Sequence, residues 1–242
     1  MHGTSRTVSG LVVALRRLLD IVACGAPLLA CLWPSRARAE GPVQAGFALL
    51  GGVGRRDLGD LDAQLARAGY RPLGQNFSSI GIGADIWIGR LLVDTELRFD
   101  SVAGATSLDG TRQAELGAES ILLGAGWAVY RSRRLRLFPS LAVGYASGQV
   151  LAPPLSPRGD DDRVSESALL VVPSAALDTL LVSSGEGSDA GLFLGLRLGY
   201  VFSVPLHDWS GSALAHPDLG MPGSSLRIVL GYRFNVGSQV EE

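Results

Sequence analysis

Hydrophobic and polar residues alternate along several stretches of the chain, which is typical of β-strands with two different faces. The clearest stretch is Leu192 to Phe202, where Leu, Tyr and Phe occupy the even positions and Gly and Arg occupy most of the odd ones. Leu226 to Val236 repeats the pattern, with Arg227, Gly231, Arg233 and Asn235 on its second face. Six further strands are predicted over 43–53, 80–89, 93–100, 113–130, 134–145 and 166–182. The alternation therefore predicts an all-β fold of about eight strands.

Two of these eight strands are less regular than the others. The two faces of 113–130 become indistinct around Ser120 to Leu122, where we expect a bulge. Residues 166–182 contain Pro173 and show no clean alternation, so the boundaries of this sixth strand are the least defined.

The connections between the predicted strands alternate strictly between short and long. Tight turns are expected at Gly89–Arg90, at 131–133 and near 183–188, and longer connections span 55–75, 101–112, 150–165 and 204–223. This is the pattern of an up-and-down antiparallel transmembrane β-barrel, which has short periplasmic turns and larger external loops. It places both ends of the barrel domain in the periplasm.

The first long connection contains a predicted short helix. Leu58, Leu61, Leu65 and Ala68 have the spacing of one helix face, and Gly69 is the expected C-terminal stop. We expect this helix to lie across the rim of the barrel.

The two faces of the strands favour a membrane rather than a soluble barrel. Inward positions of a soluble barrel vary in size to fill a tapering core, whereas the apolar rows here are uniformly Leu, Ile, Val and aromatic. Aromatic residues also lie toward several strand ends, as in the interfacial girdles of membrane barrels. A secreted soluble β-protein remains the alternative.

The second face combines glycines with charges of both signs, which predicts a narrow, polar lumen. The predicted lumen charge network comprises Asp94, Glu96, Arg98, Arg197, Arg227 and Arg233. These side chains either line a pore or hold the lumen shut by ion pairs. Since an eight-stranded barrel is just wide enough for side chains to fill it, the closed lumen is favoured.

Residues 1–39 are predicted to be a signal peptide, which leaves 40–242 as the barrel domain. Arg6, Arg16 and Arg17 form a positive n-region, and Ile21–Trp33 is an apolar stretch too short to span a bilayer as a helix. Ala37 and Ala39 supply the small-x-small pattern expected at the cleavage site. Cys24 also fits a lipoprotein motif by residue type, but the short apolar run before it argues against this alternative.

The composition of the expected mature chain excludes several classes of function. Both cysteines lie in the leader, so disulfides and Cys-based metal sites are not expected. All 21 basic residues are Arg; 16 Arg remain against 22 Asp and Glu once five Arg and Asp20 leave with the leader. A net charge near −6 without basic runs argues against nucleic-acid binding. No stretch after Glu40 contains 18 consecutive apolar residues, which excludes a helical membrane protein.

The C-terminal stretch Leu230–Phe234 resembles the terminal-strand signal of bacterial outer-membrane proteins. The signal residues are Gly231, Tyr232 and Phe234, followed here by eight more residues, whereas the signal often ends the chain. The overall plan is similar to small barrels of the OmpA, OmpX and OmpW type. The resemblance implies the outer membrane of a Gram-negative bacterium, with its lipid and the barrel-assembly machinery as partners, and we expect a monomer.

Other polar motifs are weaker candidates for chemistry. His207 and His216, with Asp208 and Ser210 nearby, could form a Ser-His-acid site at the rim, but spacing in a loop does not place a base beside its nucleophile. Asp160, Asp161 and Asp162 could bind calcium but lack ordered ligand spacing, and Asp109-Gly110 indicates a turn. Gly51-Gly52-Val53-Gly54 lacks the Lys-Ser/Thr of a phosphate loop.

The sequence therefore predicts a non-enzymatic outer-membrane barrel without a cofactor, metal or catalytic site, with a structural or surface-interaction role carried by its external loops. The alternatives are a narrow channel or carrier for small apolar molecules, and a lipid-modifying enzyme at the rim.

Overall fold

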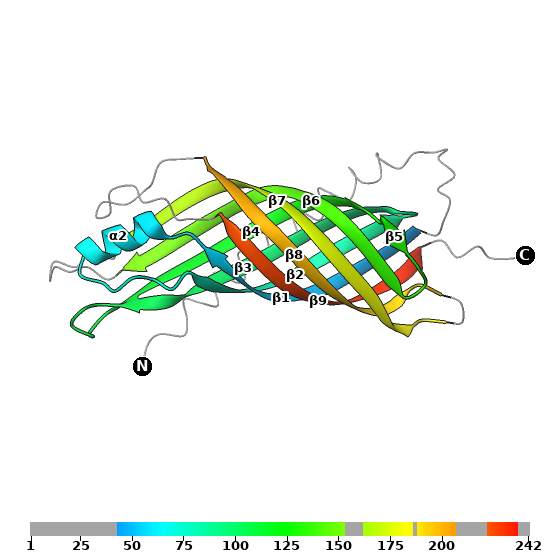
Figure 1. Cartoon of the computed structure of the whole chain (residues 1–242), viewed down its shortest axis with the longest axis horizontal. Helices are drawn as coiled ribbons and strands as arrows, with labels where there is room; N and C mark the ends of the chain where they lie inside the picture. The colour runs from blue at the N-terminus through cyan, green and yellow to red at the C-terminus, as the bar shows by residue number, and fades with distance from the viewer. Residues whose placement is uncertain (1–42, 153–161, 186–187, 207–221, 237–242) are drawn as a thin grey trace, which may run out of the picture. The chain divides into compact units, whose positions relative to one another are not determined.

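The computed structural model describes residues 43–152, 162–185, 188–206 and 222–236. These residues form strands joined by short segments and one helix (Figure 1). The elements are β1 (Val43–Arg56), α2 (Gly59–Arg67), β2 (Asn76–Ile88), β3 (Leu91–Thr106), β4 (Gln113–Trp127), β5 (Tyr130–Arg131), β6 (Leu135–Ala152), β7 (Asp162–Ser183), β8 (Gly191–Pro205) and β9 (Gly223–Val236).

The eight long strands form a closed antiparallel barrel. Each pairs with its neighbour in the chain, β4 pairs with β6, and β9 returns to pair with β1. The two-residue β5 pairs only with the start of β6. Closure satisfies the backbone hydrogen bonds of every long strand from within the barrel, which is required of strands that cross a bilayer. The expected all-β, eight-stranded, up-and-down barrel is confirmed.

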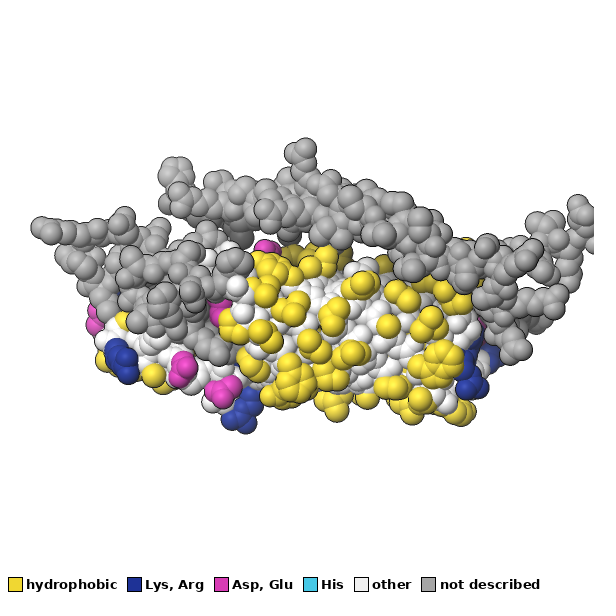
Figure 2. Space-filling model, turned by 90° about the horizontal axis from the view of Figure 1, so that it is seen from above, with side chains coloured by type: hydrophobic (Ala, Val, Ile, Leu, Met, Phe, Trp, Pro, Cys, Tyr) yellow, Lys and Arg dark blue, Asp and Glu magenta, His cyan; other side chains and the backbone are white. Residues whose placement is uncertain are grey.

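The outer surface of the barrel is an apolar band. Outward positions carry large hydrophobic side chains on all eight strands, such as Leu49, Ile80, Leu198 and Ile228, and Figure 2 shows hydrophobic side chains covering the visible wall. The aromatic residues expected near the strand ends all point outward and are exposed, namely Trp127, Tyr130, Tyr145, Tyr200, Phe202, Tyr232 and Phe234. The leucine-rich rows therefore face away from the barrel interior.

Polar residues mark where the apolar band ends on one side. Five strands place a polar side chain outward just beyond their last large apolar residue: Ser78, Ser101, Glu119, Ser167 and Ser224. In β6, Ser147 lies at the same level, and one exposed apolar residue, Leu151, follows it. Several of these polar residues are paired across neighbouring strands, and the Ser78 and Ser101 hydroxyls lie 3.0 Å apart. Beyond this limit, β3, β4, β6 and β7 continue for several residues. We call this side, which also bears α2, the loop end, and the opposite side the turn end.

The irregularities of the strands differ from those expected from the sequence. The bulge predicted around Ser120–Leu122 is wrong, since β4 alternates without interruption and Ser120 and Leu122 both point inward. The pattern was indistinct because the inward Leu122 belongs to an apolar part of the lumen. Register shifts instead lie between Val102 and Ala105 and between Leu180 and Val182.

Several strands are longer than predicted. Residues 101–106 belong to β3, and 150–152 and 162–165 belong to β6 and β7, although all were expected in loops. The weak sixth strand is β7, in which Pro173 pairs with Leu141 of β6 and interrupts the pairing with β8. Pro lacks the N–H that a second ladder needs, which explains the local break.

The short helix forms where it was predicted. Leu58 precedes α2 as its N-cap, and Gly69 follows with a φ of 84°, the left-handed conformation that ends helices. Leu58, Leu61 and Leu65 are fully buried. No helix among the described residues has the length and apolar character needed to cross a bilayer.

Candidate functional site

The middle of the lumen contains eight charged side chains, which we call the charged layer. Four are acidic and four are basic, and each is at most 8% exposed: Asp85, Asp94, Glu96, Asp178, Arg98, Arg197, Arg227 and Arg233. Glu96 contacts the guanidinium groups of Arg98, Arg197 and Arg227, with 2.9 Å between its Oε2 and Arg98 Nε. The opposite signs balance, so the layer is held by ion pairs rather than left as isolated buried charges.

A second set of pairs completes the charged layer. Arg197 Nη1 lies 3.1 Å from Asp94 Oδ2. Arg233 Nη2 lies 3.0 Å from Asp85 Oδ2 and also contacts Asp178, and its guanidinium carbon lies 3.8 Å from the centre of the Phe193 ring. Planar guanidinium groups can bind two carboxylates and stack on a ring at once, which suits Arg to this site.

The charged layer depends on closure of the barrel. Along the wall, like charges are neighbours, because Asp85 is directly opposite Asp94 in register and Arg197 is opposite Arg227. Like charges in such positions destabilise a sheet. Their partners come from across the lumen, 103 residues away in the chain for Arg197 and Asp94. The β2–β3 and β8–β9 walls therefore attract each other only in the closed ring.

Lumen glycines make room for these side chains. A Cβ at Gly46 would lie 2.6 Å from Asp85 Oδ1 and 2.8 Å from Arg233 Cγ, and one at Gly52 would lie 2.7 Å from Arg227 Cγ. Contacts this short are incompatible with the observed positions. The glycines that alternate with charged residues on the inward face of the strands are thus required to leave space for the charged side chains.

The loop end of the lumen is filled by apolar side chains. Leu58, Leu61 and Leu65 of the α2 region pack in one buried cluster with lumen residues that include Phe77 and Leu122. Next to this cluster Arg56 pairs with Asp100. The helix therefore closes the barrel from this side, rather than only crossing its rim.

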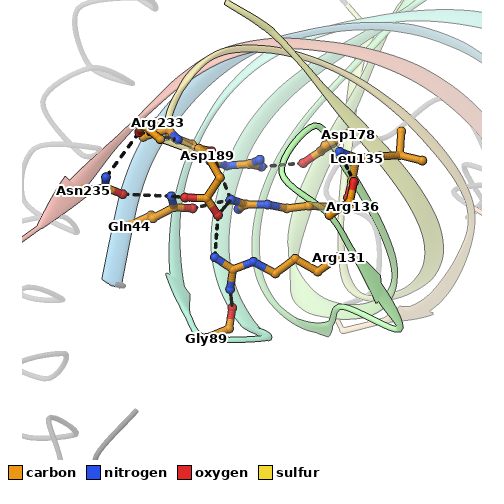
Figure 3. Close-up of polar contacts among 12 residues, drawn as sticks. Gln44, Gly89, Arg131, Leu135, Arg136, Asp178, Asp189, Arg233 and Asn235 are labelled. Atoms are coloured by element: carbon orange, nitrogen blue, oxygen red, sulfur yellow. Dashed lines mark hydrogen bonds and ion pairs between the residues drawn. The ribbon is translucent and has the colours of Figure 1, made fainter. Parts of the chain in front are cut away.

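The turn end is closed by Asp189, which lies in the β7–β8 turn (Figure 3). Its carboxylate accepts hydrogen bonds from Gln44 Nε2 at 2.6 Å, Arg131 Nη2 at 2.6 Å and Arg136 Nη2 at 3.0 Å. Gln44 Oε1 in turn accepts from Arg136 at 2.5 Å. We call these four residues the turn-end latch. A cavity of about 10 Å³ beside the latch is large enough for one water molecule.

The latch changes the acidity of its carboxylate. Burial raises the pKa of Asp189, but the hydrogen bond from Arg131 and the charges of Arg136 and Arg131 outweigh it, so the pKa lies below its ordinary value. The charged form of Asp189 is therefore the form that the latch stabilises.

The structure places all six residues of the predicted lumen charge network in the charged layer. Sequence reasoning missed Asp85 and Asp178, and it missed the whole latch. Asp85 and Arg136 lie on inward faces that the alternation did reveal, so the signal was present. Asp178 was hidden by the irregular pattern of its strand, and nothing in the sequence marks a turn residue such as Asp189 as part of the lumen.

The remaining candidates are outside the lumen or outside the described residues. His207, His216, Asp208, Ser210, Asp160, Asp161 and the leader residues Ala37 and Ala39 are not described, nor is the side chain of Asp162. Asp109-Gly110 is a turn as predicted, with Gly110 at a φ of 74°. The hydrogen bonds from Ser107 and Thr111 lower the pKa of Asp109 to about 2. Gly51–Gly54 lie within β1, and the described residues contain no His, Cys, Asp and Glu cluster suited to a metal ion.

Gly231, Tyr232 and Phe234 lie on β9 near the turn end. Tyr232 and Phe234 point outward, and Tyr232 stacks against the Phe47 ring of β1. The last strand therefore presents an aromatic row on the outside of the seam between β9 and β1.

No family model matches the chain, and no curated protein matches its sequence. Among solved structures, Ail, the attachment invasion locus protein of Yersinia pestis, in complex with sucrose octasulfate, is 12% identical with a TM-score of 0.49, covering 80% of this chain and all of Ail. The outer membrane protease OmpT from Escherichia coli is 10% identical with a TM-score of 0.38, covering 84% of this chain and 99% of OmpT. The translocator domain of NalP from Neisseria meningitidis is 11% identical with a TM-score of 0.35, covering 94% of this chain and 98% of that domain.

Strand pairing and the distribution of side chains define the architecture directly. The eight long strands close on themselves, apolar residues face outward, and charged residues fill the inside. A band of this kind matches the outward face of bacterial barrels that cross a bilayer. The architecture of this chain is that of a small bacterial outer-membrane β-barrel protein.

Proposed function

We propose that this chain is a non-enzymatic outer-membrane protein, whose closed barrel supports a structural or surface-interaction role at the loop end. The charged layer is the observation that carries the proposal. Its eight buried side chains, together with the apolar cluster under α2 and the turn-end latch, fill the lumen at three levels. A barrel filled in this way has its exterior and its two ends left for function.

The loop end has features that suit contact with other molecules. The extended parts of β3, β4, β6 and β7 and the exposed side of α2 lie beyond the polar limit of the apolar band. Its exposed charges are of both signs, since the connection between β1 and β2 exposes Arg67 and Arg71 as well as Asp57 and Asp60. This mixture favours partners of mixed polarity over polyanions such as the sucrose octasulfate bound to Ail.

Conductance in planar bilayers tests the closed lumen. We expect the purified protein to give no sustained ohmic steps, with a general porin in the same bilayers as the positive control. Serine substitutions at Glu96 and Arg197 shorten facing side chains in the charged layer, and this variant serves as a matched widened barrel. Sustained steps from the wild type would contradict the proposal and support the channel alternative.

A gene deletion tests the role at the loop end. We expect the deletion to change either uptake of a hydrophobic dye, as a structural role requires, or cell aggregation and attachment, as a surface role requires. Complementation with Ala63→Glu/Ala66→Glu/Arg67→Glu, on the exposed side of α2, separates the two because it alters the surface but not the lumen. A deletion strain indistinguishable from wild type in both assays contradicts the proposal.

Export and assembly are further parts of the proposal. We expect removal of residues 1–39 by cleavage after Ala39, insertion by the barrel-assembly machinery and a monomer surrounded by outer-membrane lipid, with no role for nucleic acid. Mass spectrometry of the mature protein should find Glu40 at its N-terminus. Phe234→Ala should reduce the amount of folded barrel in cells, whereas Phe202→Ala, an outward aromatic of similar exposure near the end of β8, should have a smaller effect.

A further inference from the structure

Two neighbouring turns at the turn end are held in a fixed arrangement. The β2–β3 turn contains Arg90, and the segment between β4 and β6 contains Arg133 and Arg134. Ala128 N donates to Arg90 O at 2.8 Å, and the Arg131 guanidinium donates to Gly89 O, so hydrogen bonds join the two turns directly. Arg131 is itself held by Asp189 of the latch. These contacts fix the backbone from which the other arginines project.

These turns carry positive charge that is not paired with a carboxylate within the described residues. Arg90, Arg133 and Arg134 are exposed and form no ion pair there, although Arg133 and Arg134 also line the cavity beside Asp189. Arg131 and Arg136 are bound by Asp189, and the neighbouring Asp178 is buried in the charged layer. At the loop end, in contrast, the segment 55–71 exposes aspartates as well as arginines. The described part of the turn end therefore concentrates unpaired guanidinium groups in a chain that is acidic overall.

The same two turns lie at the margin of the apolar band on the turn-end side. Trp127, Val129 and Tyr130 are 53%, 56% and 52% exposed and precede Arg133 and Arg134 in the chain. Trp and Tyr at such positions lie at the level of lipid headgroups, where their rings are partly apolar and partly polar. Cations next to this level meet the headgroup phosphates. A soluble anion would gain nothing from the adjoining aromatic side chains, whereas a lipid contacts both.

We infer that Arg90, Arg133 and Arg134, with Trp127 and Tyr130, form a binding site for anionic phospholipid in the leaflet that surrounds the turn end. The guanidinium groups bind the headgroup phosphate through paired N–H donors, and the aromatic side chains contact the glycerol and upper acyl region. The site assumes the membrane placement proposed above, but it is independent of the role of the loop end.

Lipid retention measured by native mass spectrometry tests this site. Phosphatidylglycerol is the probe, mixed in equal amounts with phosphatidylethanolamine in detergent micelles containing the folded barrel. We expect the wild type to retain phosphatidylglycerol preferentially, and Arg90→Gln/Arg133→Gln/Arg134→Gln to lower that preference about fivefold per arginine, hence by about a hundredfold for all three. The control Arg55→Gln/Arg67→Gln/Arg71→Gln removes the same charge at the loop end and should keep the preference. Added salt should weaken it.

The failures of the two proposals differ in this experiment. Heat-modifiability shows whether each variant is still folded. If folded turn-end and control variants both give the same lipid ratio as the wild type, the lipid site alone is overturned. A wild type with no preference between the two lipids also overturns it. A protein that does not enter bilayers at all overturns the proposed membrane function instead.

Discussion

Replacing Glu96 by Gln tests the charged layer most directly, because this one carboxylate contacts three arginines. Gln has nearly the same shape as Glu, so the packing of the lumen is kept while the negative charge is removed. Arg98 and Arg227 then lose their ion-pair partner, and Arg197 retains only Asp94. The new amide N–H₂ also faces guanidinium donors, which cannot accept its hydrogen bonds.

The magnitude follows from burial and from the number of partners. Two unit charges about 4 Å apart interact by about 4 kcal/mol at an effective dielectric constant near 20, and most of that gain is offset by the desolvation of both ions. Removing one partner removes the attraction but leaves the other charge buried. Measured losses for such changes are about 3–5 kcal/mol, and we expect a value in this range for the free energy of unfolding of Glu96→Gln.

Urea unfolding in lipid vesicles, followed by tryptophan fluorescence, measures this loss. The matched control is Glu119→Gln, the same chemical change at an exposed position on the adjacent strand, which should alter stability by less than about 0.5 kcal/mol. In a double-mutant cycle, Glu96→Gln with Arg227→Gln should cost less than the sum of the single changes. A Glu96→Gln protein within about 1 kcal/mol of the wild type would refute the idea that ion pairs hold the lumen closed.

Three further predictions concern the other parts of the lumen. Leu61→Ala should destabilise the barrel by about 2–5 kcal/mol, because it leaves a cavity under α2, whereas Leu108→Ala at an exposed position should have little effect on the unfolding midpoint. Asp189→Asn should cost about 1–2 kcal/mol through weakened charged hydrogen bonds. Because the pKa of Asp189 is depressed, its contribution should be present above about pH 4 and be lost as the pH falls through its lower folded value; unfolding midpoints of wild type and variant should converge in acid. Gly46→Ala should cost about 1–3 kcal/mol by forcing Asp85 away from its partner, and an unchanged urea unfolding midpoint would contradict this steric requirement.

The faces of most strands could be predicted from sequence, because a strand alternates with a period of two and lipid accepts only apolar side chains. The rows on β8 and β9 point where the alternation placed them. The prediction of strand faces was weakest where the inward face is also apolar. In β4 and β7 the inward positions near the loop end hold Leu122, Leu170 and Val172, so both faces are apolar and no alternation is visible.

The helix was also predictable, since the spacing of its leucines and the glycine after it are local signals. Its role in closing the barrel was not predictable from the sequence. The same Leu61 and Leu65 that indicate an amphipathic helix do not reveal what covers them, and only the fold shows them inside the mouth of the barrel.

The partners of the lumen charges could be decided only by the tertiary structure. The sequence by itself determined that charges of both signs share the inward face with glycines, because these residue types and their period are local properties. It did not determine that Arg197 pairs with Asp94 and Glu96, or that Asp189 turns inward to hold Arg131 and Arg136. Such contacts join strands about one hundred residues apart and turns with no periodic pattern, and they exist only after the ring has closed.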